Sequence, residues 1–440
     1  MAFLCPSLRV SAPPRESPLR FSRSPHMPPK RILLADCDSY FVRCAMLADP
    51  DGAGRSELVI VGGKPEGRGV VTSASYGARK FGVHAGMPMA TAVRLCPQAV
   101  FRPVPGEMVR AKHQEVRAVL EAWAPVVEAA SVDEFYLDLT GTERLYHHEP
   151  LEDTCRRIQA EVLERTGIGL SIGAATGRTL AKMAAGVNKP FGVCVVPPGG
   201  EREFMGRFAL ADIPGVGPSF AESLRKRGTT MVRDLARLDR ATVVGWLGES
   251  RGGWLHALAR GEDAGGVAPR RRQQKSVSHE RTFPADVADP AELETRLMML
   301  TVDTGASLRK ERLRGRTVTV RVRYGDFTDR SASRTLPEPI ESDRAIFAVA
   351  RELLASLLAR RGGGVRLLGV GVSKLGREAE EEPALFAELP NAAETERDRR
   401  LSEAADRLRA RFGDEAIRPA RIVPRAGEGR RGRGGSEGEG

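Results

Sequence analysis

The sequence lacks the patterns that mark several classes of protein. None of its six cysteines belongs to a CxxC pair or stands at zinc-ligand spacing from a histidine, so a structural zinc site is not expected. No apolar run approaches the roughly 20 residues of a membrane-spanning helix. Residues 1–30 lack the apolar core of a secretory signal and are expected to be a disordered extension. We therefore expect a soluble, cytoplasmic protein whose cysteines are small core residues.

Acidic residues are the minority among the charged side chains. The chain has 57 acidic and 68 basic residues and a formal net charge of +11, with an isoelectric point near 9.7. A chain this basic usually binds a polyanion, either nucleic acid or an anionic membrane surface. With 41% hydrophobic residues over 440 positions, the chain can form hydrophobic cores in about two to four domains.

Hydrophobic patterning in the first half of the chain changes repeatedly between the strand period and the helix period. The predicted strands are 31–35, 58–62, 135–139 and 169–175, and the predicted helices are 107–124, 151–166 and 179–187. Strands interleaved with helices in this way indicate an α/β or α+β unit.

The composition changes near residue 197. Residues 213–217 (IPGVG) predict a turn that joins two helices, at 219–227 and 231–238. A stretch rich in Gly and Arg at 261–274 is typical of a linker. The patterning after it predicts a last globular unit. The elements of that unit are helices at 290–311 and 343–360 and strands at 317–324 and 365–373.

Three carboxylates stand at the ends of two predicted hydrophobic strands. Asp36 follows the first strand, and Asp133 and Glu134 precede the strand at 135–139. Converging carboxylates repel and raise one another's pKa unless a cation such as Mg²⁺ neutralises them, and such a cluster suits two-metal phosphoryl transfer. For each acid alone, the alternative is a strand-end residue that faces water. Strand alternation places Asp38 on the same face as Asp36.

Two further segments carry side chains that can hold phosphate groups. Tyr76 and Arg79 are three residues apart and would share one face of a helical turn, where both can hydrogen-bond a phosphate. Lys189 stands at the end of the predicted helix 179–187, before Pro190. The alternatives are a solvated basic helix start for the first segment and a partner of the helix dipole for the lysine.

Taken together, these segments resemble the sequence motifs of the Y family of translesion DNA polymerases, in particular its DNA polymerase IV branch. The motifs follow the family's order and spacing between residues 31 and 376. The matching segments are 36–41 (DCDSYF), 75–83 (SYGARKFGV), 131–138 (SVDEFYLD), 181–190 (AKMAAGVNKP), 275–283 (KSVSHERTF) and 321–327 (RVRYGDF).

The resemblance implies an α+β multidomain fold of the right-hand polymerase type. It would contain a palm, small fingers, a helical thumb with a helix-hairpin-helix and a C-terminal α/β little finger. The expected boundaries are 1–30 for the extension, 31–39 and 106–197 for the palm, 40–105 for the fingers, 198–264 for the thumb, 265–280 for a linker, 281–376 for the little finger and 377–440 for the tail. The tail is expected to be acidic and helical after residue 376 and then disordered, with a low-complexity end at 427–440.

The resemblance also implies roles for particular residues. Phe41 would be the steric gate, a flat ring that leaves no room for the 2′-hydroxyl of a ribonucleotide. The metal ligands, for two Mg²⁺ ions, would be Asp36, Asp133, Glu134 and the backbone carbonyl of Cys37. The triphosphate-binding residues would be Ser73, Tyr76, Arg79 and Lys189. The DNA-binding residues would be Gly215 and Gly217 of the hairpin and Arg321 and Arg323 of the little finger.

The implied function is low-fidelity, template-directed DNA synthesis past damaged bases, without proofreading, by a monomeric enzyme associated with the nucleoid. Its expected partners are primer–template DNA, deoxynucleoside triphosphates and, through Leu385 and Phe386, the sliding clamp. For this Leu–Phe pair the alternative is a helix staple. The alternative function is a catalytically inactive relative that acts as an adaptor in a mutasome. Such adaptors lose the carboxylates, and this chain keeps all three, so we favour the active enzyme.

Overall fold

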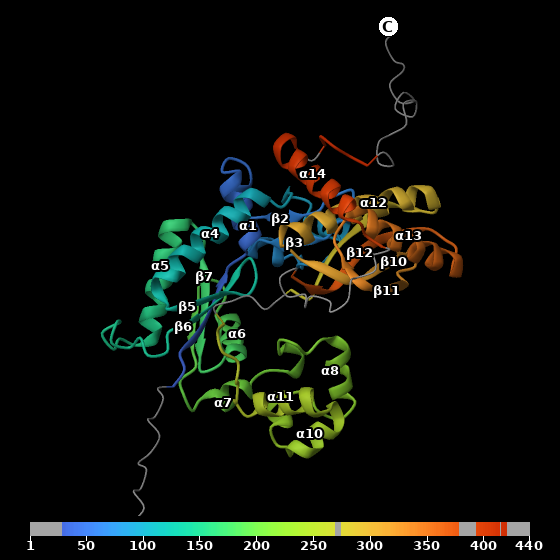
Figure 1. The fold of residues 1–440 in the computed structure, drawn as a ribbon. Coiled ribbons are helices and arrows are strands. Elements are labelled where there is room, and N and C mark those ends of the chain that lie inside the picture. The colour runs from blue at the N-terminus through green and yellow to red at the C-terminus, as the bar shows by residue number, and fades with distance from the viewer. Residues whose placement is uncertain (1–28, 269–273, 378–392, 414, 420–440) are drawn as a thin grey trace, which may run out of the picture. The chain divides into compact units, whose positions relative to one another are not determined.

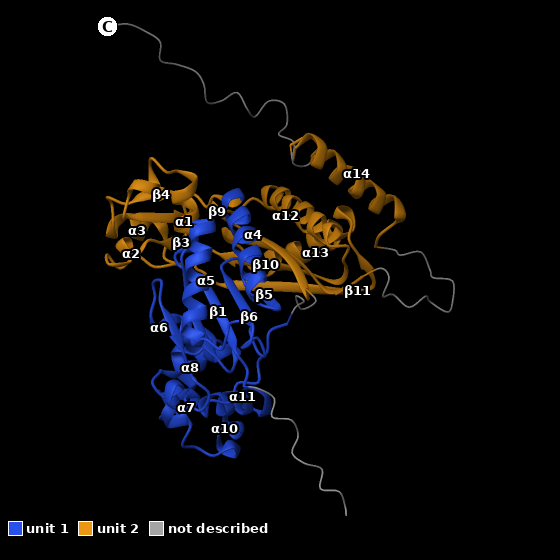
Figure 2. Cartoon of the chain, turned by 90° about the vertical axis from the view of Figure 1, so that its left-hand side faces the viewer, with its two compact units in different colours: residues 1–40, 107–269 blue, residues 41–106, 270–440 orange. Residues whose placement is uncertain are grey.

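The computed structural model describes residues 29–268, 274–377, 393–413 and 415–419. The chain forms two compact units, one from residues 1–40 and 107–269 and the other from residues 41–106 and 270–440 (Figure 2). Each unit combines sheets with helices (Figure 1), so the α+β multidomain prediction is confirmed. The predicted clamp-binding residues Leu385 and Phe386 lie outside the described residues.

The first unit is built on a five-stranded sheet with the strand order β5-β6-β1-β7-β8. Its strands are β1 (Ile32–Cys37), β5 (Val126–Ala129), β6 (Glu134–Asp138), β7 (Leu170–Ala175) and β8 (Val193–Val195). Strand β1 is antiparallel to both β6 and β7, whereas β7 and β8 are parallel. The strands predicted at 31–35, 135–139 and 169–175 are confirmed, with ends that differ by one or two residues.

Helices pack against the hydrophobic side chains that the strands of this sheet direct to its faces. The helices next to it are α4 (Gly106–Trp123), α5 (Leu151–Thr166) and α6 (Arg178–Val187). Ile32 and Leu34 of β1 are buried in one cluster with residues of α6, and Asp36, two positions further, therefore faces the same side. Gly173 in β7 allows α6 to come close, since a Cβ there would lie 2.1 Å from backbone atoms of the helix.

A group of short helices completes the first unit and shares its core with α6. Its elements are α7 (Glu201–Met205), the 3-10 helix η2 (Leu210–Asp212), α8 (Pro218–Arg225), α9 (Val232–Leu235), α10 (Arg240–Leu247) and α11 (Glu249–Ala259). The sequence predicted that the turn at 213–217 joins the two helices that correspond to α8 and α9. In the structure this turn instead lies before both, between η2 and α8. These helices are so short that hydrophobic periodicity locates their connections poorly.

The second unit contains a small sheet of order β3-β2-β4, in which β2 is antiparallel to β3 and parallel to β4. Its elements are α1 (Tyr40–Ala48), the 3-10 helix η1 (Ala53–Arg55), β2 (Val59–Gly62), β3 (Val71–Ala74), α2 (Tyr76–Arg79), α3 (Met89–Leu95) and β4 (Val100–Arg102). Small residues such as Ala74, Ala78 and Ala92 make up much of the core of this part.

A second sheet of the same unit has the order β11-β10-β12-β9 and is antiparallel throughout. Its elements are β9 (Ser276–Val287), α12 (Pro290–Lys310), β10 (Arg314–Tyr324), β11 (Asp329–Ile340), α13 (Asp343–Arg360) and β12 (Val365–Gly376). Strand β9 begins inside the predicted linker 265–280. It is an edge strand with few buried residues, so its sequence shows no regular alternation.

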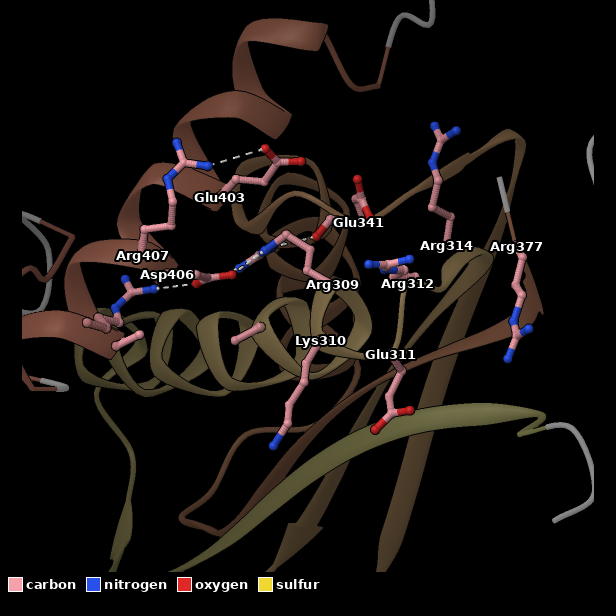
Figure 3. Close-up of a pocket in the computed structure, with 13 residues that line it drawn as sticks. Arg309, Lys310, Glu311, Arg312, Arg314, Glu341, Arg377, Glu403, Asp406 and Arg407 are labelled. Carbon is pink, nitrogen blue, oxygen red and sulfur yellow. Dashed lines mark hydrogen bonds and ion pairs between the residues drawn. The ribbon is translucent and has the colours of Figure 1, made fainter. Parts of the chain in front are cut away.

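A last helix, α14 (Glu396–Phe412), packs against α12 and α13 and lies in the part of the tail that is predicted to be acidic and helical. Asp406 of α14 accepts a hydrogen bond from Arg309 of α12 at 2.6 Å, and Ser402 accepts one from the backbone N–H of Asp343 at 3.2 Å. Figure 3 shows Arg309 and Asp406 in the pocket between these helices. Because Arg309 pairs with both Asp343 and Asp406, it joins α14 to α12 and α13 at this pocket.

The cysteines behave as predicted wherever the structure describes them. The buried free cysteines are Cys37, Cys44, Cys96 and Cys155, and Cys194 is half-buried. None of the helices in the described residues is long and apolar enough to cross a membrane.

Candidate active site

Two neighbouring strands bring the three predicted carboxylates to one end of the first unit's sheet. In the antiparallel pairing of β1 and β6, Asp36 stands directly opposite Glu134, and residues paired in this way point to the same face. The backbone N–H of Cys37 donates to the carbonyl oxygen of Asp133 at 2.9 Å, which places Asp133 beside the end of β1. The structure therefore gathers residues that are far apart in the sequence.

Two lysines face these carboxylates. The Nζ of Lys182, on α6, donates to both carboxylate oxygens of Glu134, at 2.6 and 2.7 Å. The Nζ of Lys189, just beyond α6, donates to Oδ1 of Asp36 at 2.5 Å. Lys182 is a residue of the site for which the sequence motifs predicted no role. Its position seven residues before Lys189, two helical turns away, was the signal that could have linked the two.

The pKa of Asp36 shows that negative charge is costly in this cluster. Burial raises the pKa of Asp36 above its ordinary value, Lys189 opposes this shift, and the charges of Glu134 and Asp133 add to it. The net direction is upward, so ionising Asp36 is less favourable in the folded protein than in water, even beside a lysine. A further cation would relieve this cost.

The donor set fits a divalent cation such as Mg²⁺, which prefers oxygen ligands. The ammonium groups beside Asp36 and Glu134 show that the site stabilises positive charge. Within the described residues, however, no three carboxylate, histidine or cysteine side chains are gathered as a ready-made metal site. Asp133 instead accepts a hydrogen bond from Ser131 at 2.5 Å. The three carboxylates therefore do not converge on one point in this arrangement. Each is bound by a different partner: Asp36 by Lys189, Glu134 by Lys182 and Asp133 by Ser131.

Asp38 is held by other protein groups. Both of its carboxylate oxygens accept a hydrogen bond from the Ser171 hydroxyl at 2.9 Å, and one accepts another from the backbone N–H of Phe191 at 2.8 Å. Strand β1 has ended at Cys37, so Asp38 lies in the following turn. It anchors the segment just after Lys189 to the strands that carry the carboxylates.

Phe41 is the second residue of α1 and packs, half-buried, against an apolar cluster that includes Val42, Val59 and Val61. The neighbouring Tyr40 is 2% exposed, and its hydroxyl donates to the carbonyl oxygen of Val109 at 2.6 Å. Tyr40 is therefore a core residue. Of these two adjacent aromatic rings, Phe41 is the one with an exposed part that a nucleotide can contact.

The predicted phosphate-binding residues of the second unit lie close together. Ser73 is in β3, and Tyr76 and Arg79 are the first and last residues of α2. The guanidinium group of Arg79 lies 4.6 Å from the centre of the Tyr76 ring, so the predicted shared face is confirmed. The Nε of Arg79 also donates to the carbonyl oxygen of Ala74 at 3.0 Å. Lys189 belongs to the first unit, where it binds Asp36.

The two glycines of the predicted hairpin lie in the turn before α8. Gly215 has a φ of +96°, a left-handed conformation that favours glycine. A Cβ at this position would also approach the Trp254 ring, at 3.5 Å. Gly217 is the N-cap of α8, and Pro218 opens the helix. A glycine-rich turn of this kind can bring backbone N–H groups close to a DNA phosphate.

The two arginines predicted to bind DNA lie on the polar face of β10. Val318, Val320 and Val322 are fully buried, and the alternating Arg321 and Arg323 are half-buried on the opposite face. Acidic residues from other strands of the sheet, which no sequence motif indicated, hold these arginines. Arg321 pairs with Glu280 at 3.0 Å and with Asp329 at 3.1 Å, and Arg323 pairs with Asp329 at 2.9 Å. The register of β9, β10 and β11, which sets these pairs, is a tertiary feature.

Asp329 should therefore limit the affinity of this face for DNA. Replacing it by Asn is expected to tighten duplex binding several-fold. It should also steepen the dependence of log affinity on log salt by about one, because Arg323 becomes available to a phosphate. Hydrogen bonds from Arg323 and Arg321 lower the pKa of Asp329 to about 2. The carboxylate thus stays ionised, and its pairs persist, until the pH falls toward that value. The effect should accordingly be constant between about pH 5 and pH 9.

Asp326→Asn is the matched control, since Asp326 is an exposed aspartate of the same hairpin that pairs with Arg361 instead. It removes the same charge but leaves Arg321 and Arg323 bound to Asp329. Fluorescence anisotropy of a labelled duplex across a salt series measures both variants. Equal salt slopes for the two would contradict the assignment of Arg321 and Arg323 to DNA binding.

Comparison with known proteins places this geometry in a family. Sequence models of the impB/mucB/samB family and of its C-terminal domain match residues 35–186 and 274–385. DNA polymerase IV of Methanoculleus marisnigri is 41% identical over 347 residues, which cover 78% of this chain and 94% of that protein. A solved Y-family DNA polymerase chimera of Dbh and Dpo4 matches with a TM-score of 0.70 and 25% identity, over 79% of this chain and 100% of the other. The chain belongs to the Y family of DNA polymerases.

Other relatives of this Y-family polymerase agree. DNA polymerase IV of Dehalococcoides mccartyi is 33% identical over 395 residues, 89% of this chain and 97% of that protein. The structure of DinB from Sulfolobus solfataricus matches with a TM-score of 0.51 and 26% identity, over 78% of this chain and 98% of the other. The protein is a DNA-directed DNA polymerase.

Proposed function

We propose that this Y-family polymerase carries out low-fidelity translesion synthesis, joining deoxynucleotides to a primer 3′-hydroxyl by two-metal-ion nucleotidyl transfer without proofreading. The observation that carries the proposal is the pairing of β1 with β6, which sets Asp36 opposite Glu134 and beside Asp133. Divalent cations bound there would activate the 3′-hydroxyl and stabilise the leaving pyrophosphate. Asp36, Asp133, Glu134 and the carbonyl group of Cys37 are the groups that would hold them.

The remaining proposed roles come from the family resemblance, and the side chains are chemically suited to them. Tyr76 and Arg79 share one face of α2, so a phenol and a guanidinium group can bind neighbouring phosphate oxygens. Ser73 and Lys189 would add a hydroxyl and a positive charge. The ring of Phe41 would lie beneath the sugar and exclude a 2′-hydroxyl.

The proposed substrates are primer–template DNA and deoxynucleoside triphosphates. One similar structure, with a TM-score of 0.53, is an insertion ternary complex of Dbh DNA polymerase, which supports this choice. Gly215 and Gly217 of the hairpin and Arg321 and Arg323 of β10 would bind the DNA backbone, and such contacts are salt-dependent. Clamp binding through Leu385 and Phe386, a monomeric state and association with the nucleoid remain predictions.

Primer extension with deoxynucleotides and Mg²⁺, on an intact and on an abasic template, tests the proposal. An active translesion enzyme extends both primers, whereas an adaptor binds the DNA and extends neither. The three retained carboxylates and their placement at one end of the sheet favour the enzyme.

Base selection is expected to be weak. The part of the second unit that carries Tyr76 and Arg79 has short helices and a core rich in alanine, which offers little bulk to reject a misfit base pair. We expect frequent misincorporation, no removal of a mismatched primer end, and extension past an abasic or minor-groove lesion. Single-nucleotide insertion kinetics and a 3′-exonuclease assay measure this. An error rate as low as that of a proofreading polymerase would contradict it.

A further inference from the structure

Helix α6 and the turn after it supply a positive charge to each of two carboxylates at the site. Lys182 donates to both oxygens of Glu134 at 2.6 and 2.7 Å, and Lys189 donates to Asp36 at 2.5 Å. The side chain of Glu134 is 21% exposed and that of Asp36 is 16% exposed. Both ion pairs are thus partly withdrawn from water, where a charge without a partner is costly.

The lysines are held in this position by the packing of α6. Gly173 lets the helix approach β7 closely. At the start of the helix, Arg178 donates to both carboxylate oxygens of Glu128 on β5, at 2.5 and 2.8 Å. The helix is therefore fixed to the sheet at its start and along its length, with Lys182 directed at the strand end that carries Glu134.

The two ion pairs affect how strongly the cluster can bind a divalent cation. Three carboxylates and two ammonium groups leave the cluster with about one net negative charge. A divalent cation must draw Glu134 away from Lys182 or bind beside an ammonium group that repels it. Either path weakens the binding of metal to the free enzyme. A triphosphate, which attracts lysines, would relieve the competition, so metal and nucleotide would favour each other's binding.

We propose that Lys182 is the resident counter-cation of Glu134, which positions this carboxylate in the metal-free enzyme and competes with divalent cations for it. The inference rests on the proposed function, because it takes Glu134 to be a metal ligand. Lys182 is a positioning residue in this role, and Lys189 acts in the same way on Asp36.

Manganese binding to the full chain, without DNA or nucleotide, tests the proposal. Free Mn²⁺ is measured by electron paramagnetic resonance as the protein is titrated. Lys182→Met is expected to bind Mn²⁺ about fivefold more tightly than the wild type, the effect of removing one partly exposed ion pair. Lys226→Met is the matched control, since Lys226 is an exposed lysine at the end of α8. Its affinity for Mn²⁺ should equal that of the wild type.

An affinity of Lys182→Met for Mn²⁺ that equals or falls below the wild-type value would overturn the proposal. Thermal unfolding provides a second readout. In a chelator, Lys182→Met should melt below the wild type, and added Mn²⁺ should narrow the gap. A gap that Mn²⁺ leaves unchanged would indicate a purely structural lysine. If Lys182→Met does not fold, Lys182→Gln, which keeps a donor but no charge, is expected to show the same tightening.

Glu134→Gln separates this inference from the proposed function. If Glu134→Gln binds Mn²⁺ as the wild type does, Glu134 is not a metal ligand and the proposed function fails with the inference. If Glu134→Gln loses Mn²⁺ affinity but Lys182→Met does not gain it, the metal assignment stands and the counter-cation role alone is wrong.

Discussion

Replacing Asp133 and Glu134 together by Ala is expected to abolish primer extension, with a loss of more than about a thousandfold. Both residues stand at the strand end opposite Asp36, and without them the proposed cations lose most of their oxygen ligands. Binding to primer–template DNA should change by no more than a few-fold, because the proposed phosphate contacts lie on other elements. A gel assay of extension and anisotropy with the same duplex measure the two effects.

Asp138→Asn is the matched control for this experiment. Asp138 is the last residue of the same strand, β6, and its Oδ1 accepts a hydrogen bond from the backbone N–H of Thr140 at 2.9 Å, which an Asn can also accept. Extension by this variant should match that of the wild type. Continued synthesis by the variant lacking Asp133 and Glu134 would show that the metal ligands lie elsewhere.

Replacing Phe41 by Ala is expected to raise the insertion of ribonucleotides by about a hundredfold relative to deoxynucleotides. Removing the ring opens space where the 2′-hydroxyl of the sugar would otherwise collide. The ring of Phe41 packs against Val42, Val59 and Val61, so its position is fixed. Loss of the ring should therefore change the selection of the sugar and leave the pairing with the template base as it is. Steady-state kinetics with dGTP and GTP opposite the same template cytosine measure the ratio.

Phe81→Ala is the control for the gate, since Phe81 is a 45% exposed aromatic residue of the same unit outside α1. It should leave the discrimination between dGTP and GTP as it is. If Phe41→Ala also leaves it unchanged, the steric-gate assignment is wrong. Tyr40 could not take over the role without rearrangement, because its ring is buried and its hydroxyl is bound to Val109.

The parts of the fold predicted correctly are those that local patterns specify. Hydrophobic patterning along 317–324 predicted a strand, and β10 covers these residues with alternating buried and half-buried side chains. The helices predicted at 290–311 and 343–360 match α12 and α13 to within one residue, because long amphipathic helices carry a strong periodic signal. Edge strand β9 and the short helices around 213–217 lack such a signal, and there the predicted boundaries or connections differ from the structure.

The candidate site shows the same division. The sequence alone, through local patterns and the resemblance to family motifs, predicted which residues carry the chemistry: Asp36, Asp133 and Glu134 at strand ends, with Tyr76 and Arg79 on one helical turn. Residue type, spacing and strand periodicity are local properties, so they can be read without a fold.

Only the tertiary structure decided which residues these groups contact. That Asp36 stands opposite Glu134 depends on the register of β1 and β6. That Lys182 reaches Glu134 depends on how closely α6 packs on the sheet. The pairing of Arg321 with Glu280 and Asp329 depends on three strands meeting in one sheet. Each of these contacts joins distant segments, and their energies depend on burial and distance, which no local pattern of residues contains.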